Sequence, residues 1–101
     1  MMVEMDLTTI LQALGDPVRL AIVRGLADGS TRACGSFGLG VAPSTASHHF
    51  KVLREAGVIE TTINGAERLQ TLRREELDAA FPGLLDSVLR ASGTASRAAA
   101  R

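Results

Sequence analysis

The clearest hydrophobic pattern in the chain lies between residues 43 and 57. Apolar or small residues recur there at spacings of three and four, which places them on one face of a helix; they are Ala46, Phe50, Leu53 and Gly57. The opposite face is short, polar and partly basic, with Ser44, Ser47, His48, Lys51 and Arg54. Small hydroxyl groups beside an imidazole suit a close approach to base edges and phosphates. The pattern therefore predicts a DNA recognition helix.

The residues around this helix predict a winged helix, a mainly α fold of the α+β kind. Pro43 suits the first helical position because that position needs no N–H, and Gly57 suits the C-terminal end. Residues 58–63 are rich in β-branched side chains and predict a strand. Asn64-Gly65 favours the positive φ angles of a two-residue hairpin turn. Residues 67–72 alternate polar and apolar and predict the return strand.

Both ends of the chain also show helical periodicity. An apolar stripe in residues 7–14 is followed by Asp16 as N-cap and Pro17 as first residue of a second helix. That helix has Val18, Ile22 and Leu26 on one face and ends at Asp28-Gly29. A further stripe is expected to be kinked or broken at Pro82; it consists of Leu77, Phe81, Leu84, Leu85 and Val88.

Residues 30–42 fit no regular pattern. Gly35, Gly38 and Gly40 each weaken a helix by roughly 1 kcal/mol relative to alanine. We expect a short, loose segment here, anchored in the core by Phe37, Leu39 and Val41.

Two blocks of the sequence resemble a known family. Residues 44–58 (Ser-Thr-Ala-Ser-His-His-Phe-Lys-Val-Leu-Arg-Glu-Ala-Gly-Val) are similar to the recognition-helix signature of the ArsR/SmtB family of bacterial transcriptional regulators. Residues 11–20 (Leu-Gln-Ala-Leu-Gly-Asp-Pro-Val-Arg-Leu) are similar to the opening pattern of that family. The blocks keep the family's order and approximate separation, and the resemblance covers roughly residues 7–90. In the family, residues 30–42 correspond to a regular helix, the first of the helix-turn-helix, so this chain departs there.

The resemblance implies a winged helix-turn-helix whose terminal helices form a dimer interface. It implies a dimeric, sequence-specific regulator of transcription, most often a repressor, that reads an inverted repeat with two recognition helices about one DNA turn apart. The residues expected to bind double-stranded DNA are Ser44, Thr45, Ser47, His48, His49, Lys51, Arg54, Asn64, Gly65 and Arg68. The alternative is a winged-helix module for protein interaction without DNA binding.

Several of these residues have a second interpretation. For His48 a DNA contact is favoured over simple solvent exposure. His49 lies near the edge of the apolar face, so a packed, hydrogen-bonded histidine that positions the helix is favoured over a base contact. Arg68 is equally consistent with a phosphate or minor-groove contact and with a solvated strand residue. Arg73 and Arg74 are expected to be a solvated helix start.

A homodimer is also expected from the two terminal stripes, since both would otherwise expose more apolar surface than monomers usually do. The chain of 101 residues is expected to form one domain over residues 1–92, with residues 93–101 as a disordered tail. Net charge is zero, but residues 44–74 carry five cations against three anions. That positive excess lies on the proposed DNA-binding part.

Other function classes find no support. The chain has no membrane-spanning apolar run, no secretory leader pattern and a single cysteine, so we expect a cytoplasmic protein. No nucleophile elbow, phosphate loop or carboxylate pair indicates an enzyme.

Cys34 is the one residue with possible chemistry of its own. Metal-sensing members of the family carry paired cysteines near residues 30–38 or Asp and His ligands on the last helix, and this chain has neither; no metal or cofactor is expected. Cys34 is favoured as a small packed apolar residue, with a thiol sensor activated by Arg32 or a helix N-terminus as the alternative. The operator and the effector ligand are left open.

Overall fold

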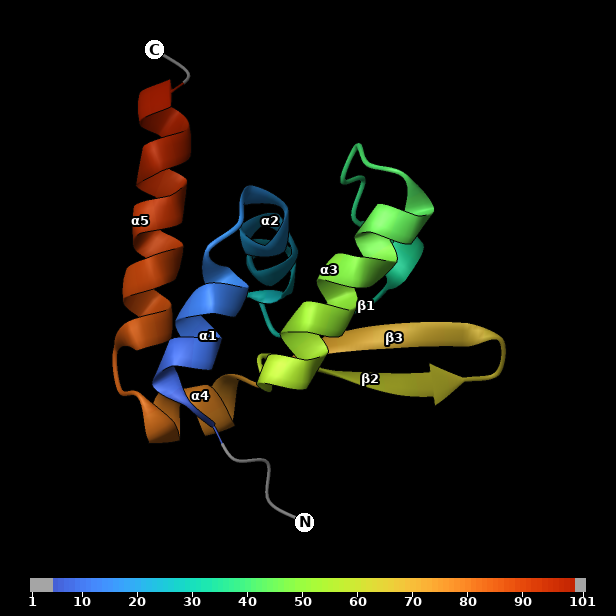
Figure 1. Cartoon of the computed structure of the whole chain (residues 1–101), viewed down its shortest axis with the longest axis horizontal. Helices are drawn as coiled ribbons and strands as arrows, with labels where there is room; N and C mark the ends of the chain where they lie inside the picture. The colour runs from blue at the N-terminus through green and yellow to red at the C-terminus, as the bar shows by residue number, and fades with distance from the viewer. Residues whose placement is uncertain (1–4, 100–101) are drawn as a thin grey trace.

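The computed structural model of the protein describes residues 5–99, with side chains as far as Ser92. The chain forms a mainly helical fold with one small antiparallel sheet, in which the strand order is β1-β3-β2. The elements in chain order are α1 (Leu7–Leu14), α2 (Pro17–Leu26), β1 (Thr31–Ala33), the short 3-10 helix η1 (Cys34–Ser36), α3 (Pro43–Ala56), β2 (Ile59–Asn64), β3 (Glu67–Leu72), α4 (Arg74–Ala80) and α5 (Leu84–Ala99) (Figure 1). The predicted winged helix is confirmed.

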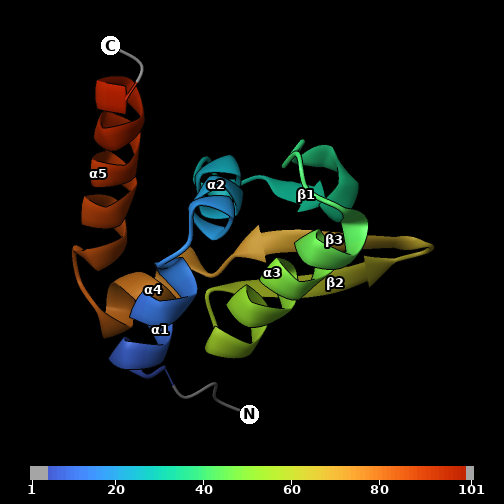
Figure 2. The ribbon, with the colours of Figure 1, turned by 45° about the horizontal axis from the view of Figure 1, so that its top comes forward.

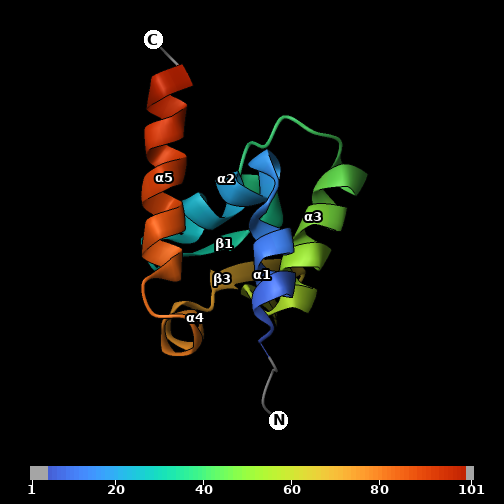
Figure 3. The same ribbon diagram turned by 60° about the vertical axis from the view of Figure 1, so that its left-hand side comes forward.

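One apolar core joins these elements. Helix α1 lies beside α3, and α2 contacts both α3 and α5 (Figure 3). The side chains that are fully buried include Ile10, Ile22, Val23, Leu26, Leu53, Val58 and Ile59. Helix α5 and the tip of the β2–β3 hairpin lie at opposite ends of the molecule (Figure 1).

The start of α2 follows the sequence prediction. The carboxylate of Asp16 accepts hydrogen bonds from the backbone N–H groups of Val18 and Arg19, at 2.8 and 3.1 Å, and Pro17 occupies the first helical position. Asp6 caps α1 in the same way, accepting a bond from the N–H of Thr9 at 3.0 Å. These carboxylates satisfy N–H groups that the first turn of a helix leaves without partners.

The glycine-rich segment forms a single 3-10 turn in place of a regular helix, in agreement with the expected short, loose segment. It also contains a strand that the sequence pattern did not predict. Strand β1 pairs with β3, with Thr31 opposite Thr71. The ring of Phe37 packs against Phe50 with centroids 5.4 Å apart, so Phe37 does anchor the segment. The prediction that Val41 is a core anchor was wrong, since its side chain is exposed.

The hairpin turn lies one residue later than predicted. Asn64 pairs with Glu67 as the last residue of β2, so the two-residue loop is Gly65-Ala66. Only Gly65 has a positive φ, of 64°. A positive first φ and a negative second φ have the signs of a type II′ turn, which requires glycine at its first central position.

The C-terminal stripe is divided between the core and the surface. The chain breaks between α4 and α5 around Pro82, as predicted. Leu77 and Leu85 are buried within the protomer, so the expectation that this whole stripe needs a partner was wrong for them. Leu7 and Leu11 on α1 are exposed, at 46% and 47%. Helix α5 extends to Ala99, and the disordered tail expected for 93–101 stays a prediction; residues 100–101 lie outside the described residues.

The cap at Asp16 makes a pH-dependent contribution to stability. Burial raises the pKa of this carboxyl, but the hydrogen bonds from the N–H groups of Arg19 and Val18, together with the charge of the Arg19 side chain, outweigh it and hold the pKa below its ordinary value. A carboxyl whose pKa is lowered by folding stabilises the native state above its unfolded pKa, and that contribution disappears as the pH falls through the folded pKa.

We therefore expect Asp16→Ala to lower the free energy of unfolding by about 1 kcal/mol at pH 7, and by less below about pH 4. Urea unfolding followed by circular dichroism at pH 7 and pH 3 measures the difference. Asp16→Asn is the matched control, because an asparagine caps a helix equally well without a charge. An alanine effect of the same size at both pH values would contradict this account.

Candidate nucleic-acid interface

Helix α3 presents one buried face and one polar face. Phe50, Leu53 and Ala56 are buried in the core. The opposite face is exposed along its whole length, with Ser44, Thr45, Ser47, His48, Lys51 and Arg54. Gly57 ends the helix with a φ of 88°, and its N–H bonds to the carbonyls of Leu53 and Arg54. The structure therefore brings six of the ten predicted DNA-binding residues together on one exposed helical face.

His49 differs from its neighbours because it faces the protein. Its side chain is only 12% exposed. The Nδ1 atom lies 3.1 Å from Nη1 of Arg19 and 3.8 Å from the Asp16 carboxylate, both at the start of α2. This environment agrees with the packed, hydrogen-bonded interpretation of His49.

The β2–β3 hairpin forms a wing next to α3 (Figure 2). Asn64, Gly65 and Arg68 are exposed at its outer end. Arg68 pairs across the ladder with Ile63, so the two side chains lie on one face of the sheet. Alternation along the strands places both on the same face as the buried Ile59 and Leu72, which is the face that the helices cover.

Sequence reasoning missed Ile63, whose side chain is 70% exposed. The sequence did offer an indication, because Ile63 lies close to the hairpin turn. Near the tip of a wing, the face of the sheet that the helices cover elsewhere is left exposed. Together, Ile63 and Arg68 offer an apolar and a cationic contact beside α3.

The two arginines after the wing have a structural role. Arg73 forms an ion pair with Glu76 at 3.3 Å, and Arg74 pairs with Asp78 at 3.3 Å and with Asp86 of α5. The side chains of Arg73 and Arg74 are only 17% and 36% exposed, so the prediction of a solvated helix start was wrong. Without these two arginines, the positive excess of residues 44–74 disappears, because the three remaining cations (Lys51, Arg54 and Arg68) are balanced in number by three anions (Glu55, Glu60 and Glu67).

Cys34 is half-buried and hydrogen-bonded. Gln70 is 1% exposed, and its Nε2 group donates to the sulfur of Cys34 at 3.1 Å. The Oε1 atom of Gln70 accepts a bond from the hydroxyl of Thr61 at 2.8 Å. The thiol thus accepts one of the hydrogen bonds that the buried amide of Gln70 can donate, which gives Cys34 a structural role that requires no reactive chemistry.

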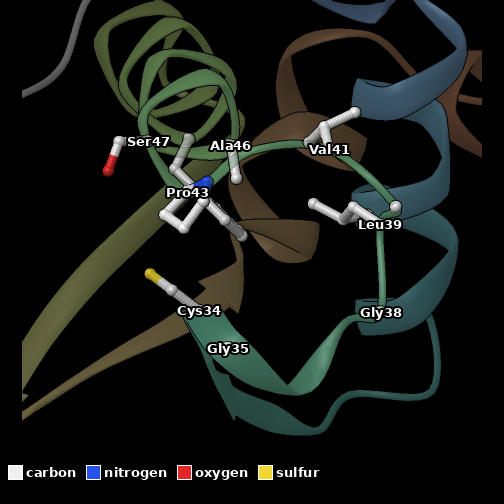
Figure 4. A pocket seen from close by; sticks show the side chains of 10 residues that line it. Cys34, Gly35, Gly38, Leu39, Val41, Pro43, Ala46 and Ser47 are labelled. Atoms are coloured by element: carbon white, nitrogen blue, oxygen red, sulfur yellow. The ribbon is translucent and has the colours of Figure 1, made fainter.

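A cavity of about 410 Å³ separates the glycine-rich segment from the first turns of α3 (Figure 4). Its walls are mainly apolar, from Leu39, Val41, Pro43 and Ala46 among others. Cys34 and Ser47 contribute its polar side chains. Among the side chains that the structure describes, no group of three or more His, Cys, Asp or Glu could hold a metal ion. None of the helices in the described part of the chain combines the length and apolar character of a membrane span.

A helix-turn-helix core with an exposed polar recognition helix and an adjoining β-hairpin defines the class of winged helix-turn-helix proteins. Comparison with known proteins identifies the family within that class. Residues 16–61 match the model of the family described as bacterial regulatory protein, arsR family. The chain is 38% identical over 82 residues to an uncharacterized HTH-type transcriptional regulator, YceK, of Bacillus subtilis (strain 168), which covers 78% of this chain and 82% of that protein.

Other comparisons agree. The chain is 36% identical over 74 residues to the arsenical resistance operon repressor of Staphylococcus xylosus, covering 72% of this chain and 71% of the relative. The transcriptional repressor BigR from Xylella fastidiosa superposes with a TM-score of 0.59 and 28% identity, over 73% of this chain and 84% of BigR. An ArsR family regulator superposes with a TM-score of 0.66 and 26% identity, over 80% and 84% of the two chains. The chain therefore belongs to the ArsR family of bacterial transcriptional regulators, which is not a family of enzymes.

The bond between Gln70 and Cys34 can be tested through stability. Cys34→Ala leaves the buried Nε2 group without an acceptor, and we expect it to lower the free energy of unfolding by about 1–3 kcal/mol. Cys34→Ser keeps an acceptor and should lose less than half as much. Chemical denaturation under reducing conditions measures both variants. Equal losses in the two would show that the sulfur is only packing volume.

Proposed function

We propose that the chain is a homodimeric repressor that binds an inverted-repeat operator through α3 and the β2–β3 wing. The observation that carries this proposal is the exposed polar face of α3, with Arg68 and Ile63 of the wing beside it. A surface that binds another protein is expected to present apolar anchors at its centre. This helix instead presents hydroxyl, imidazole and cationic groups, and the exposed large apolar side chains near it lie off the helix, Ile63 on the wing and Val41 in the preceding loop.

The side chains divide between base and phosphate contacts. Ser44, Thr45, Ser47 and His48 are short and lie on the first half of α3, where they suit base edges. Lys51, Arg54 and Arg68 suit phosphates, and Asn64 and Gly65 bring the wing backbone close to DNA. Because three exposed anions accompany these three cations, electrostatic attraction is modest. We expect specificity to depend on the base contacts more than on charge.

A second copy of the chain is the proposed partner at the surface formed by α1 and α5, at the end of the molecule opposite the tip of the wing. Leu7 and Leu11 are exposed on α1. A neighbouring groove of about 400 Å³ lies between α1, α2 and α5, lined by Leu11, Leu14, Gly15, Leu20, Val88, Ala91 and Ser92. This surface is largely apolar, and a two-fold related copy would cover it with the same surface.

The signal that releases DNA is proposed to be something other than a metal ion. One relative is named as the repressor of an arsenical resistance operon. This chain has a single cysteine, so it lacks the paired cysteines that the family's metal sensors carry. With its double-stranded DNA partner, the protein is proposed to work in the cytoplasm.

DNA binding through α3 predicts two kinds of mutational effect. Lys51→Ala should weaken binding to all sequences alike and reduce the slope of log affinity against log salt by about one unit. Ser47→Ala or His48→Ala should cost about 1–3 kcal/mol, concentrated at particular base pairs. Fluorescence anisotropy with labelled duplexes, at several salt concentrations, separates the two patterns.

Glu75→Ala is the matched control, since Glu75 is exposed on α4 outside the proposed interface. A protein with Ser47, His48 and Lys51 all replaced that still footprints its operator would overturn the proposed site. Wild-type protein that binds no duplex from a genomic pool would favour the protein-interaction alternative.

The homodimer is tested at Leu11. Sedimentation of the wild type should give about twice the chain mass of 10.6 kDa at micromolar concentration. Leu11→Glu should give monomers and lose operator binding at the same time, because a buried charge at an apolar interface is costly. Ile63→Glu, a similar change on the wing, should remain dimeric. A monomer that binds the palindrome with full affinity would contradict the proposal.

A further inference from the structure

Arg19 lies where three helices meet. Its Nε group donates to the carbonyl of Ala13 at 2.6 Å, and Nη2 donates to the carbonyl of Gln12 at 3.2 Å. These carbonyls belong to the last turn of α1, where helical carbonyls lack the usual partner within the helix. The carbonyl of Gln12 also accepts from the N–H of Gly15, which ends α1, at 3.2 Å. The third group, Nη1, lies 3.1 Å from Nδ1 of His49 on α3. One side chain of α2 thus connects the end of α1 with the recognition helix.

The chemistry of this contact fixes the state of the imidazole. A guanidinium has only donors, so the Nδ1 atom of His49 must accept with its lone pair. His49 is then neutral and carries its proton on Nε2. The Asp16 carboxylate, 3.8 Å from Nδ1, is occupied by the N–H groups of Val18 and Arg19, and it fixes the turn of α2 from which Arg19 extends.

The hydrogen bond between Arg19 and His49 restrains the rotation of α3, which packing in the core alone does not. Burial of Phe50 and Leu53 holds α3 against the protein, but apolar burial is non-directional and tolerates a small rotation or slide. Recognition requires the reading side chains to be held within about 0.5 Å and 10–20° of the productive geometry. A hydrogen bond from a rigid planar guanidinium to a ring on α3 is directional at this level.

We propose that Arg19 and His49 are positioning residues for DNA recognition, and that their hydrogen bond fixes the orientation of α3 relative to the end of α1. Neither side chain contacts DNA in this role. Because α1 carries the exposed Leu7 and Leu11, the same bond relates the recognition helix to the proposed dimer surface. The inference rests on the proposed DNA-binding function, and part of its test is independent of DNA.

The first measurement uses the free protein. Long-range ¹H–¹⁵N spectra at pH 8, where imidazoles are neutral, report which ring nitrogen carries the proton. We expect His49 to show protonated Nε2 and bare Nδ1, and Arg19→Met to change the Nδ1 signal of His49 while the signals of the exposed His48 stay in place. A protonated Nδ1 in the wild type, or a His49 signal unchanged by Arg19→Met, would overturn the inference.

The second measurement compares operator affinity in variants that circular dichroism shows to be folded. Arg19→Met and His49→Leu should each weaken binding about ten-fold, the equivalent of one hydrogen bond to a charged group. The double variant should bind no worse than the single variant with the lower affinity, because each single change already removes the same hydrogen bond. His49→Asn places an amide oxygen where Nδ1 was and should stay within about three-fold of the wild type.

These outcomes separate the two proposals. If the wild type binds operator and His49→Asn is as weak as His49→Leu, or if the single losses multiply in the double variant, the positioning role is wrong while DNA binding stands. Should Arg19→Met be unfolded, Arg19→Lys keeps the charge and one donor, and it should weaken binding in the folded protein. A wild type that binds no DNA would overturn the proposed function, and with it the role of the bond in recognition.

Discussion

The exposed polar face of α3 depends on the burial of the opposite face of the same helix in the core. Phe50 and Leu53 are 3% and 0% exposed beneath α1, α2 and the sheet. Full burial of such side chains contributes about 1.5–3 kcal/mol each, against about 1 kcal/mol net for one hydrogen bond. The core therefore holds α3 in place, and the polar contacts around Arg19 and His49 determine how it is turned. With one face buried, every short polar side chain of the helix faces outward.

The glycine-rich segment before α3 changes how the helix-turn-helix is built. A regular first helix would pack against α3 along its length. Here the segment contributes β1, a single 3-10 turn and a loop, with Gly38 and Gly40 at positive φ values of 61° and 73°. Fewer side chains then fill the space beside the start of α3, and a cavity remains there. Phe37 and the bond from Gln70 to Cys34 keep the segment attached where a helix would otherwise pack.

The C-terminal part shows how core and partner surfaces share one helix. Leu85 faces inward and completes the protomer, while Val88 and Ala91, further along α5, line the groove that also contains Leu11. A charge at the buried Leu85 would disturb the protomer's own core, whereas a charge at the exposed Leu11 bears on association alone. Arg74 joins α4 to α5 through Asp86, whereas Arg73 pairs with Glu76 within α4, so both arginines that the sequence suggested as solvated have structural partners.

The sequence by itself determined the recognition helix, the hairpin and the capped start of α2. Asp16, Pro17 and Gly57 act through backbone groups within a few residues, and helical period assigns Phe50 and Leu53 to one face by local geometry alone. Only the tertiary structure decided which neighbour covers each face. The pairing of β1 with β3, the bond between Arg19 and His49, and the bond between Gln70 and Cys34 join residues 30 to 40 positions apart. Periodicity shows which side chains point the same way, but burial and pairing depend on what the folded chain places opposite them, and for that reason Leu85, Arg73 and Arg74 differed from their predictions.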